Sequence, residues 1–224
     1  APSSTEEDLI NAKNLADEMQ VKLYIKDVDI FVDENITNNS KDRCYHCKSH
    51  LFKQALELKD ELGYGYVIDG TNTDDHKVYR PGLTALKDLG VISPLNMAGF
   101  SKEMVRSLAK ELGISVAKRP SAPCLLTRFP YNTKITPEKL DRVEKAESFI
   151  RSLGFIKFRV RDHSNIARIE LEKDDFIKFL EIKDQVIKEF KDLGFSYVTL
   201  DLEGFRSGSM DEGLTKEEKE KWVL

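Results

Sequence analysis

The chain opens with the pattern of an amphipathic helix followed by a strand. Ser4 and Glu7 have the spacing of a capping box, which marks a helix start. One apolar face follows at helical spacing, formed by Leu9, Ala12, Ala16 and Met19. Residues 21–28 then alternate like a strand. Because a strand normally precedes such a helix in an α/β fold and none does here, we expect the natural protein to begin earlier.

Helical and strand patterns continue to alternate up to about residue 133. Helices are expected at about 49–62, 83–89 and 101–112, and glycines close the first and the last of them. Residues 66–68 form a short apolar run that predicts a buried strand, and the segment VISPL follows at 91–95. This alternation predicts a doubly wound parallel sheet, in which ligands bind at the ends of the strands.

The pattern changes after Cys124 and predicts a second, smaller domain. A helix begins at Thr136, and an alternating segment at 158–171 predicts a hairpin that turns at Ser164 and Asn165. A further helix to about Leu193 and a strand at 196–202 complete an α+β unit. We therefore divide the chain into an α/β domain at 1–133 and an α+β domain at 134–224. The charged last residues are expected to form a solvated tail or a terminal helix.

Composition narrows the class of protein. With 224 residues and 40% hydrophobic content, the chain can form one large domain or two small ones. Its apolar runs are far shorter than the roughly 20 residues that cross a bilayer, and no secretory signal is visible, so a soluble, cytoplasmic protein is expected. The 35 basic and 39 acidic residues leave a net charge of −4, which argues against nucleic acid, including tRNA, as the main partner.

The sequence contains only three cysteines, which is too few for a disulfide framework. Cys44 and Cys47 are separated by two residues, and Cys124 lies far away in the sequence. Three such thiolates can hold an iron–sulfur cube and leave one iron open for sulfide or substrate, whereas ordinary cubes have four cysteines. Two alternatives stay open: a structural zinc site completed by His50, and three unrelated buried thiols.

Two polar regions could bind ligands. In the loop from Asp69 to Gly82, Gly70 lets the backbone approach a ligand, and further polar side chains crowd the end of a predicted strand. The alternative is an ordinary loop rich in turn residues. In the second domain, Arg159 and Arg161 point to the same face of a strand.

Other charged residues accompany these two arginines. Arg168 and Glu170 lie on the returning strand, and Arg206 follows in GFRSGS. Clustered arginines suit the recognition of phosphate or carboxylate groups. The alternative is a solvated sheet face with cross-strand ion pairs, and Glu147 would equally be expected at the surface.

Taken together, these motifs resemble the LarE family along essentially the whole chain. They follow in the order RCYHCK, VIDGTNTDD, YRPGL, SPL, a K-E-x-V-R helix, SAPCLLTRFPY, FRVRDH, ARIEL and LDLEGFRSGS. LarE proteins are ATP-dependent enzymes that insert sulfur into pyridinium-3,5-biscarboxylic acid mononucleotide, for the nickel-pincer nucleotide of lactate racemase. The resemblance implies a Rossmann-like PP-loop ATPase domain, here incomplete because the SGGxDS loop that grips ATP phosphates is absent from the chain.

The resemblance also implies roles for the cysteines. Cys124 occupies the sulfur-donor position, where some members surrender their own sulfur and become dehydroalanine. Other members carry cysteines that match Cys44 and Cys47 and are similar to tRNA thiolases, in which three cysteines hold a 4Fe-4S cluster with an extra sulfide. Since all three cysteines are present, the cluster is favoured. A tRNA-thiolating enzyme and a zinc-stabilised nucleotide-binding module without catalysis are the rival interpretations.

The same resemblance assigns the remaining site residues and partners. The expected nucleotide-binding residues are Asp69, Gly70, Thr71, Asn72 and Arg80, and the expected catalytic residues are Cys124 and Asp74. The expected substrate- and phosphate-binding residues are Arg159, Arg161, Arg206, Glu147 and Glu170. ATP, Mg²⁺, a pyridinium mononucleotide and sulfide or another sulfur donor are the implied ligands. The protein is expected to be a homo-oligomer.

Overall fold

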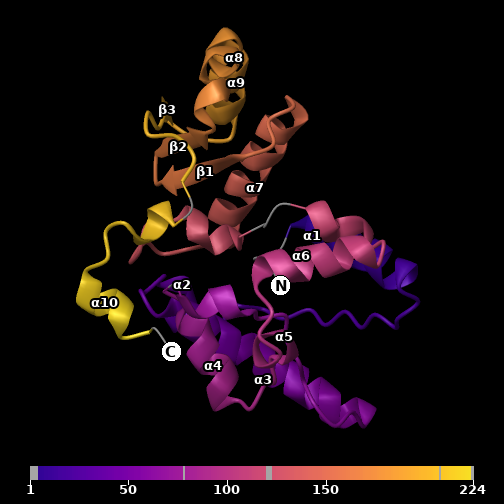
Figure 1. The fold of residues 1–224 in the computed structure, drawn as a ribbon. Helices are drawn as coiled ribbons and strands as arrows, with labels where there is room; N and C mark the ends of the chain where they lie inside the picture. The colour runs from indigo at the N-terminus through magenta and orange to yellow at the C-terminus, as the bar shows by residue number, and fades with distance from the viewer. Residues whose placement is uncertain (1–4, 78, 120–122, 207, 223–224) are drawn as a thin grey trace.

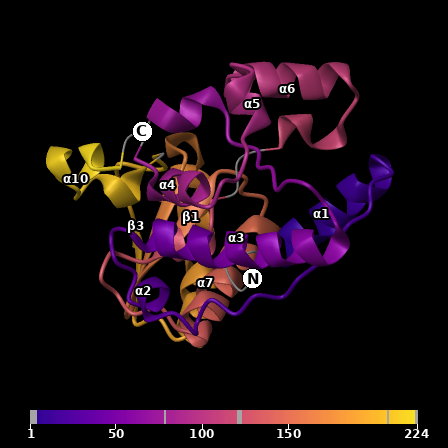
Figure 2. The same cartoon turned by 90° about the horizontal axis from the view of Figure 1, so that it is seen from below.

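The computed structural model describes residues 5–77, 79–119, 123–206 and 208–222. The helices α1 to α6 form the lower part of the view in Figure 1, and the three-stranded sheet with α7 to α9 forms the upper part. The view from below shows α3 running across the face of the molecule, with α7 and β1 behind it (Figure 2). None of the described helices is long and apolar enough to cross a bilayer.

The lower part is built mainly from helices. They are α1 (Glu6–Glu18), α2 (Glu34–Thr37), α3 (Arg43–Leu62), α4 (Pro81–Asp88), α5 (Pro94–Met97) and α6 (Lys102–Glu111). Short 3₁₀ turns lie at Thr73–Lys77, Ser115–Lys118 and Leu125–Arg128. The capping box of α1 is formed by Thr5 and Asp8, one residue later than predicted. The predicted cap of α6 is confirmed, since the Ser101 side chain accepts a hydrogen bond from the Met104 amide.

The main correction to the predicted helices concerns α3. It begins at Arg43 instead of residue 49, so Cys44 and Cys47 lie on its first turns. It ends where predicted, at Gly63, whose φ of 73° is the left-handed conformation that glycine adopts without strain. The early start places the cysteine motif on a rigid element instead of in a loop.

Two strand predictions in this part are wrong in detail. Residues 21–28 form no strand, and Val21 and Ile25 are exposed, because none of the described segments pairs with them. Ile68 forms a single parallel bridge with Ile92, but Tyr66 and Ile68 are 77% and 64% exposed, so the run is not buried. The structure is a mixed α/β fold, and its described residues form one three-stranded sheet, which lies in the upper part.

The upper part confirms the predicted order of helix, hairpin, helix and strand. It consists of α7 (Pro137–Ser152), β1 (Phe158–His163), β2 (Ile166–Leu171), a 3₁₀ turn (Lys173–Asp175), α8 (Phe176–Glu181), α9 (Lys183–Asp192) and β3 (Tyr197–Leu200). Strand β2 pairs antiparallel with β1 and parallel with β3. The predicted helix to Leu193 is divided at Ile182. One apolar cluster, which includes Phe155, Val160, Ile169 and Phe190, fills the space between the sheet and its helices.

A second apolar cluster joins α7 to the lower part. It consists of Ile30, Ile36, Cys47, Leu125, Leu126, Phe129, Ile135, Leu140 and Val143. Hydrogen bonds tie the same segments together, since the fully buried Asn39 side chain donates to the carbonyls of Phe129 and Pro130 at 3.2 and 2.7 Å. The first half of α7 therefore packs against the segments that carry the cysteines.

The last described residues return to the lower part. We call residues 208–222 the C-terminal strap; it includes the 3₁₀ turn Ser209–Asp211 and α10 (Lys216–Glu220), which confirms the predicted terminal helix (Figure 1). Tyr131 donates a hydrogen bond to Asp211 at 2.7 Å, and Lys41 forms an ion pair with Glu218. The strap is thereby fixed next to the start of α3.

We expect Asn39→Ala to lower the free energy of unfolding by about 1–3 kcal/mol, because two buried carbonyls lose their donor. Urea denaturation followed by circular dichroism measures this loss. The exposed Asn35, whose side chain bonds only to Asp33, provides the control: Asn35→Ala should stay within about 0.5 kcal/mol of the unsubstituted protein. Equal effects of the two substitutions would contradict the role assigned to Asn39.

Candidate functional site

The start of α3 carries two of the three cysteines. Cys44 and Cys47 lie one helical turn apart, which places both on one side of the helix. Cys47 is buried, Cys44 is half-buried and Cys124, which directly precedes the 3₁₀ turn Leu125–Arg128, is exposed. None of the three forms a disulfide. The site therefore offers one accessible, one partly accessible and one enclosed sulfur.

The three sulfurs influence one another electrostatically. Burial raises the pKa of Cys47 to about 12, and the nearby Cys124 and Cys44 sulfurs contribute to this shift. Removing the proton from Cys47 at neutral pH therefore needs a compensating positive charge. Within the described part of the chain, no group of three or more His, Cys, Asp or Glu side chains is arranged to hold a metal ion. The cluster remains a prediction.

Arg43 is the cation nearest to these sulfurs. It is only 2% exposed and donates hydrogen bonds to Asn39 Oδ1 at 2.5 Å, to the Leu126 carbonyl at 2.7 Å and to Cys44 Sγ at 3.3 Å. Burial alone would lower its pKa, yet the pKa of Arg43 is raised, because the Cys44 and Cys124 sulfurs lie close to it. Sequence reasoning missed this residue, although it directly precedes the cysteine motif.

His50 contacts the backbone of another segment. Its Nε2 lies 3.1 Å from the Asp29 carbonyl oxygen. This contact occupies one ring nitrogen of His50, and the zinc site considered from the sequence stays an untested alternative.

Helix α4 packs against the cysteine turn. A Cβ built on Gly82 would lie 2.9 Å from Lys48 Cγ and 3.4 Å from the Cys44 carbonyl oxygen. Tyr79, just before this helix, donates a hydrogen bond to the Lys41 carbonyl at 2.6 Å, and burial raises its pKa. The YRPGL motif thus forms part of the wall around Cys44.

The predicted nucleotide loop is held by its own hydrogen bonds. Asp69 accepts one from Thr71 and one from Ser93, each at 2.5 Å, which joins the ends of the two segments bridged at Ile68 and Ile92. No atom lies within 4 Å of a Cβ built on Gly70, so the backbone there is open to a ligand.

The second half of this loop faces the start of α6. Asp74 accepts a hydrogen bond from the Lys102 amide at 2.9 Å, and the Asn72 amide donates to Asp75 at 3.0 Å. Arg80 forms an ion pair with Asp75 at 2.9 Å. The structure therefore places Asp69, Gly70, Thr71, Asn72, Asp74 and Arg80 in one region, and their role in nucleotide binding stays a prediction.

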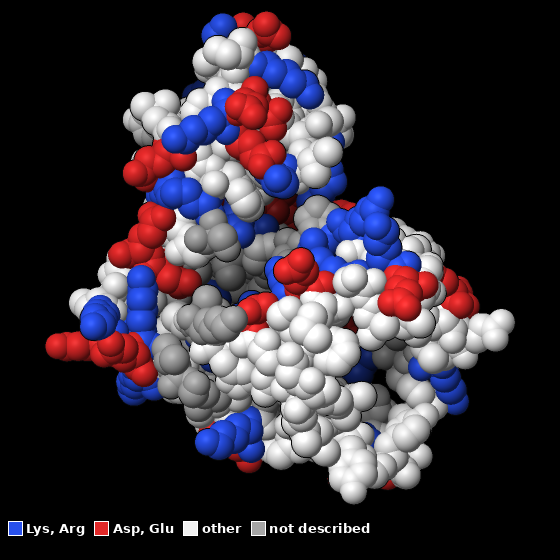
Figure 3. Space-filling model, in the orientation of Figure 1, with Lys and Arg blue, Asp and Glu red and all other residues white. Residues whose placement is uncertain are grey.

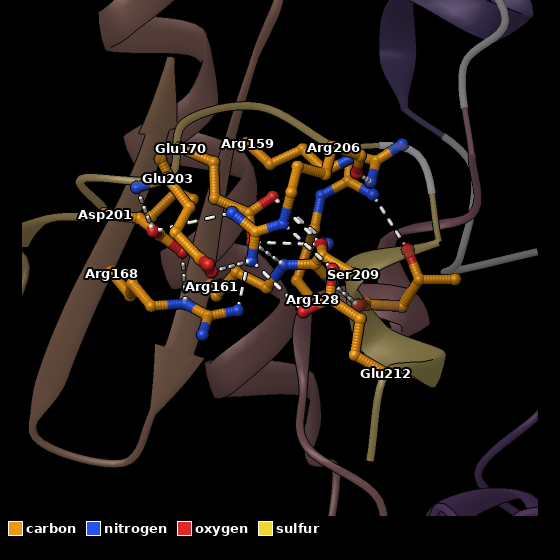
Figure 4. A network of polar contacts seen from close by, with 12 residues as sticks. Arg128, Arg159, Arg161, Arg168, Glu170, Asp201, Glu203, Arg206, Ser209 and Glu212 are labelled. Carbon is orange, nitrogen blue, oxygen red and sulfur yellow. Dashed lines mark hydrogen bonds and ion pairs between the residues drawn. The ribbon is translucent and has the colours of Figure 1, made fainter. Parts of the chain in front are cut away.

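In the upper part, three of the predicted substrate-binding residues are engaged in buried ion pairs; Figure 4 shows the pair of Arg161 and Glu170. Arg161 donates to both oxygens of Glu170 at 2.7 and 3.2 Å and also to Ser209. Glu147 is 4% exposed rather than at the surface, and Arg128 donates to both of its oxygens at 2.6 and 3.1 Å. Arg128 and Ser209 were not found from the sequence, because their partners lie far away along the chain.

Arg159 differs from its neighbours. It lies over the Phe205 ring at 4.7 Å and donates to the Arg206 carbonyl at 3.1 Å, while its buried Nε has no hydrogen-bond partner. Burial, together with Arg161 and Arg128, lowers its pKa to about 10. No carboxylate of the described residues forms an ion pair with it, so Arg159 retains the capacity to bind an anion.

Arg206 is more exposed and already has acidic partners. It pairs with Glu212 and Glu203 at 2.9 Å each and lies 3.6 Å from Asp201 (Figure 4). The hydrogen bond with Glu212 is the main cause of its raised pKa. A ligand would have to displace these carboxylates, which makes Arg206 a weaker candidate than Arg159.

A cavity of about 280 Å³ lies between the C-terminal strap and the arginine-bearing face of the sheet. Its lining combines apolar residues such as Phe129 and Leu214 with the polar side chains of His163 and Arg168. His163 Nε2 and Arg168 Nε are buried without a hydrogen-bond partner. Arg168 Nε lies 3.7 Å from an Asp201 carboxylate oxygen, so His163 Nε2 is the less compensated of the two nitrogens. Apolar walls with a few polar groups are typical of a small-ligand pocket.

Comparisons with known proteins add to this geometry. No protein-family model matches the chain. The chain is 40% identical over 212 residues to a pyridinium-3,5-bisthiocarboxylic acid mononucleotide synthase of Lactiplantibacillus plantarum, which covers 95% of the chain and 77% of that protein. It is 41% identical over 218 residues to an uncharacterized protein of Synechocystis, with 96% and 81% covered. A tRNA-specific 2-thiouridylase of Thermoanaerobacter is 26% identical over 145 residues, with 55% and 40% covered.

We expect Arg128→Met to lower the free energy of unfolding by about 3–5 kcal/mol, because Glu147 would be left as an uncompensated buried charge. The matched control is Lys145→Met on the same helix, since Lys145 forms an exposed ion pair with Asp141. That change should cost less than about 1 kcal/mol. Urea denaturation of both variants tests the contrast, and similar losses would show that burial of the pair is unimportant.

Proposed function

This chain belongs to the LarE family of sulfur-transferring enzymes, and we propose that it inserts sulfur into pyridinium-3,5-biscarboxylic acid mononucleotide in an ATP-dependent reaction. The product would be the thiocarboxylate precursor of a nickel-pincer nucleotide. One observation carries this proposal: three thiols of graded exposure lie around a buried guanidinium at the start of α3. Such a site is suited to holding nucleophilic sulfur.

The donor set supports a 4Fe-4S cluster at this site. The three thiols lie close enough to influence one another, since, in addition to burial, Cys124 and Cys44 both raise the pKa of Cys47. A thiolate at Cys47 therefore needs an added positive charge, which a metal centre provides. Cys44, Cys47 and Cys124 would hold the cluster. When bound, it would supply the sulfide that is transferred, so that the protein could act repeatedly.

We propose that the loop from Asp69 to Arg80 binds ATP next to the thiols. Its open Gly70 and its carboxylates suit a nucleotide with Mg²⁺, which prefers oxygen ligands, and Asp74 is the proposed catalytic carboxylate. The single parallel bridge between Ile68 and Ile92 supports the view that these segments are neighbouring strands of a doubly wound sheet. The loop would then lie at their carboxyl ends.

The proposed chemistry has two steps. A substrate carboxylate oxygen attacks the α-phosphorus of ATP. The bond between the α-phosphorus and the bridging oxygen breaks, and pyrophosphate leaves with its electron pair. A sulfur nucleophile then attacks the resulting acyl adenylate, and AMP leaves as the carbon–sulfur bond forms. Each step exchanges one bond for another, and no electrons are gained or lost.

Substrate anchoring is assigned chiefly to Arg159. Its spare donors can bind a phosphate or carboxylate, while Arg161, Glu147 and Glu170 hold the surrounding strands in place through their ion pairs. Arg206 lies next to Arg159, which donates to its carbonyl (Figure 4). The adjoining cavity beside His163 has room for the planar part of a small ligand.

A tRNA substrate is the rival within the superfamily. The acidic net charge does not favour it, and Figure 3 shows basic and acidic side chains interspersed over the upper part of the molecule. Binding of tRNA with a steep salt dependence would revive this rival.

We expect Arg159→Met to weaken substrate binding about ten- to hundredfold, because a charge-assisted hydrogen bond of about 1.5–3 kcal/mol is lost. Isothermal titration with the pyridinium mononucleotide measures the affinity, and thermal unfolding checks the fold. Arg151→Met is the control, since Arg151 is a largely exposed arginine of the same part of the molecule. Unchanged affinity in a folded Arg159 variant would remove this residue from the site.

The origin of the sulfur tests the function itself. We expect turnover of anaerobically prepared protein with ATP, substrate and isotopically labelled sulfide to give a labelled thiocarboxylate, with Cys124 intact by peptide mass spectrometry. Cys44→Ala and Cys47→Ala should each abolish repeated turnover, since three ligands leave none to spare.

Two other outcomes would be informative. Dehydroalanine at position 124 with unlabelled product would replace the cluster route by sacrifice of Cys124. No thiocarboxylate under any condition, together with thiolated tRNA in a parallel reaction, would overturn the proposed substrate.

A further inference from the structure

Arg43 is a buried cation, and among the described residues no carboxylate accepts a hydrogen bond from it. Its acceptors are the Asn39 amide oxygen, the Leu126 carbonyl and the Cys44 sulfur, and its Nε is buried without any partner. A guanidinium always carries its charge. An isolated buried charge costs several kcal/mol, so a site of this kind requires a nearby anion.

Two other buried arginines have the nearby anion that a buried charge requires. Arg128 and Arg161 are each held by both oxygens of a buried glutamate. Among the described residues, no carboxylate forms an ion pair with Arg43. Arg43 directly contacts the Cys44 sulfur, at 3.3 Å, and this sulfur can carry a negative charge. The Cys124 sulfur and Tyr131 also contribute to the raised pKa of Arg43.

The same side chain also joins the two cysteine-bearing segments. Its bond to the Leu126 carbonyl reaches the 3₁₀ turn that directly follows Cys124, while its own backbone lies next to Cys44. A change at Arg43 consequently affects both the charge and the spacing of the thiol site.

We propose that Arg43 is the positioning residue that makes the thiol site selective for anionic sulfur, such as hydrosulfide or a sulfur-bearing anion delivered to Cys44 and Cys124. The inference deepens the proposed sulfur transfer and rests on it for its biological meaning. Its test needs neither ATP nor substrate, so the two can fail separately.

The test compares two alkylating reagents of equal size and different charge. Iodoacetate is an anion and iodoacetamide is neutral; in both reactions the thiolate sulfur displaces iodide as a sulfur–carbon bond forms. Because both reagents need the thiolate, the ratio of their rates at one cysteine cancels its degree of ionisation. The ratio therefore reports the local charge alone, and peptide mass spectrometry measures it at Cys44 and Cys124 in reduced, chelator-treated protein.

We expect this ratio to be on the order of tenfold higher in the folded protein than in the same protein unfolded in urea. Arg43→Met should abolish the difference, and Arg151→Met, which removes a remote charge, should preserve it. A folded ratio equal to the unfolded one, or an Arg43→Met ratio equal to that of the unsubstituted protein, overturns the proposal.

If Arg43→Met fails to fold, the rate ratio of the unsubstituted protein, folded against unfolded, still tests whether the thiol site prefers the anionic reagent. Arg43→Lys then replaces it as the variant: it retains the charge and must retain the preference for iodoacetate, and loss of that preference would count against the proposal. A normal preference in protein that forms no thiocarboxylate would leave Arg43 as assigned and contradict only the proposed function.

Discussion

The contact between Arg43 and the segment after Cys124 is the interaction on which the site depends. Asn39 accepts from Arg43 and donates to two carbonyls of the segment 129–130, so one polar set fixes the start of α3 against a stretch about ninety residues away in the chain. The apolar cluster around Leu126 and Val143 encloses this set and keeps water from competing for its hydrogen bonds. Without these hydrogen bonds, the distance between Cys124 and the two cysteines of α3 would not be fixed.

The buried charges of the molecule fall into two kinds. The pairs Arg128–Glu147 and Arg161–Glu170 are complete, with both carboxylate oxygens occupied. The first pair joins the 3₁₀ turn Leu125–Arg128 to α7, and the second joins β1 to β2. Arg159 and Arg43 keep donors that no described side chain fills. Complete arginine–glutamate pairs therefore stabilise the fold. Arginines whose donors lack an acceptor are the sites where an anionic ligand is expected to bind.

Local patterns were sufficient for elements whose signals lie within a few residues. The Thr136 cap and the turn at Ser164 depend on neighbouring positions, and both were predicted. Glu147 was expected at the surface, because its partner Arg128 could not be identified from spacing alone. The alternation at 21–28 predicted a strand, but a strand also needs a partner, which a periodic pattern does not supply. Long-range pairing accounts for most of what the sequence left undetermined.

The C-terminal strap also gives the site an order of assembly. Lys41 and its strap partner Glu218 are 177 residues apart in the chain. At roughly 5–20 residues per second, a ribosome needs on the order of 10–35 s to make that stretch. Throughout this interval the cysteine turn of α3 exists without the segment that lies beside it. The last helix can therefore dock beside the start of α3 only after nearly the whole chain has been made.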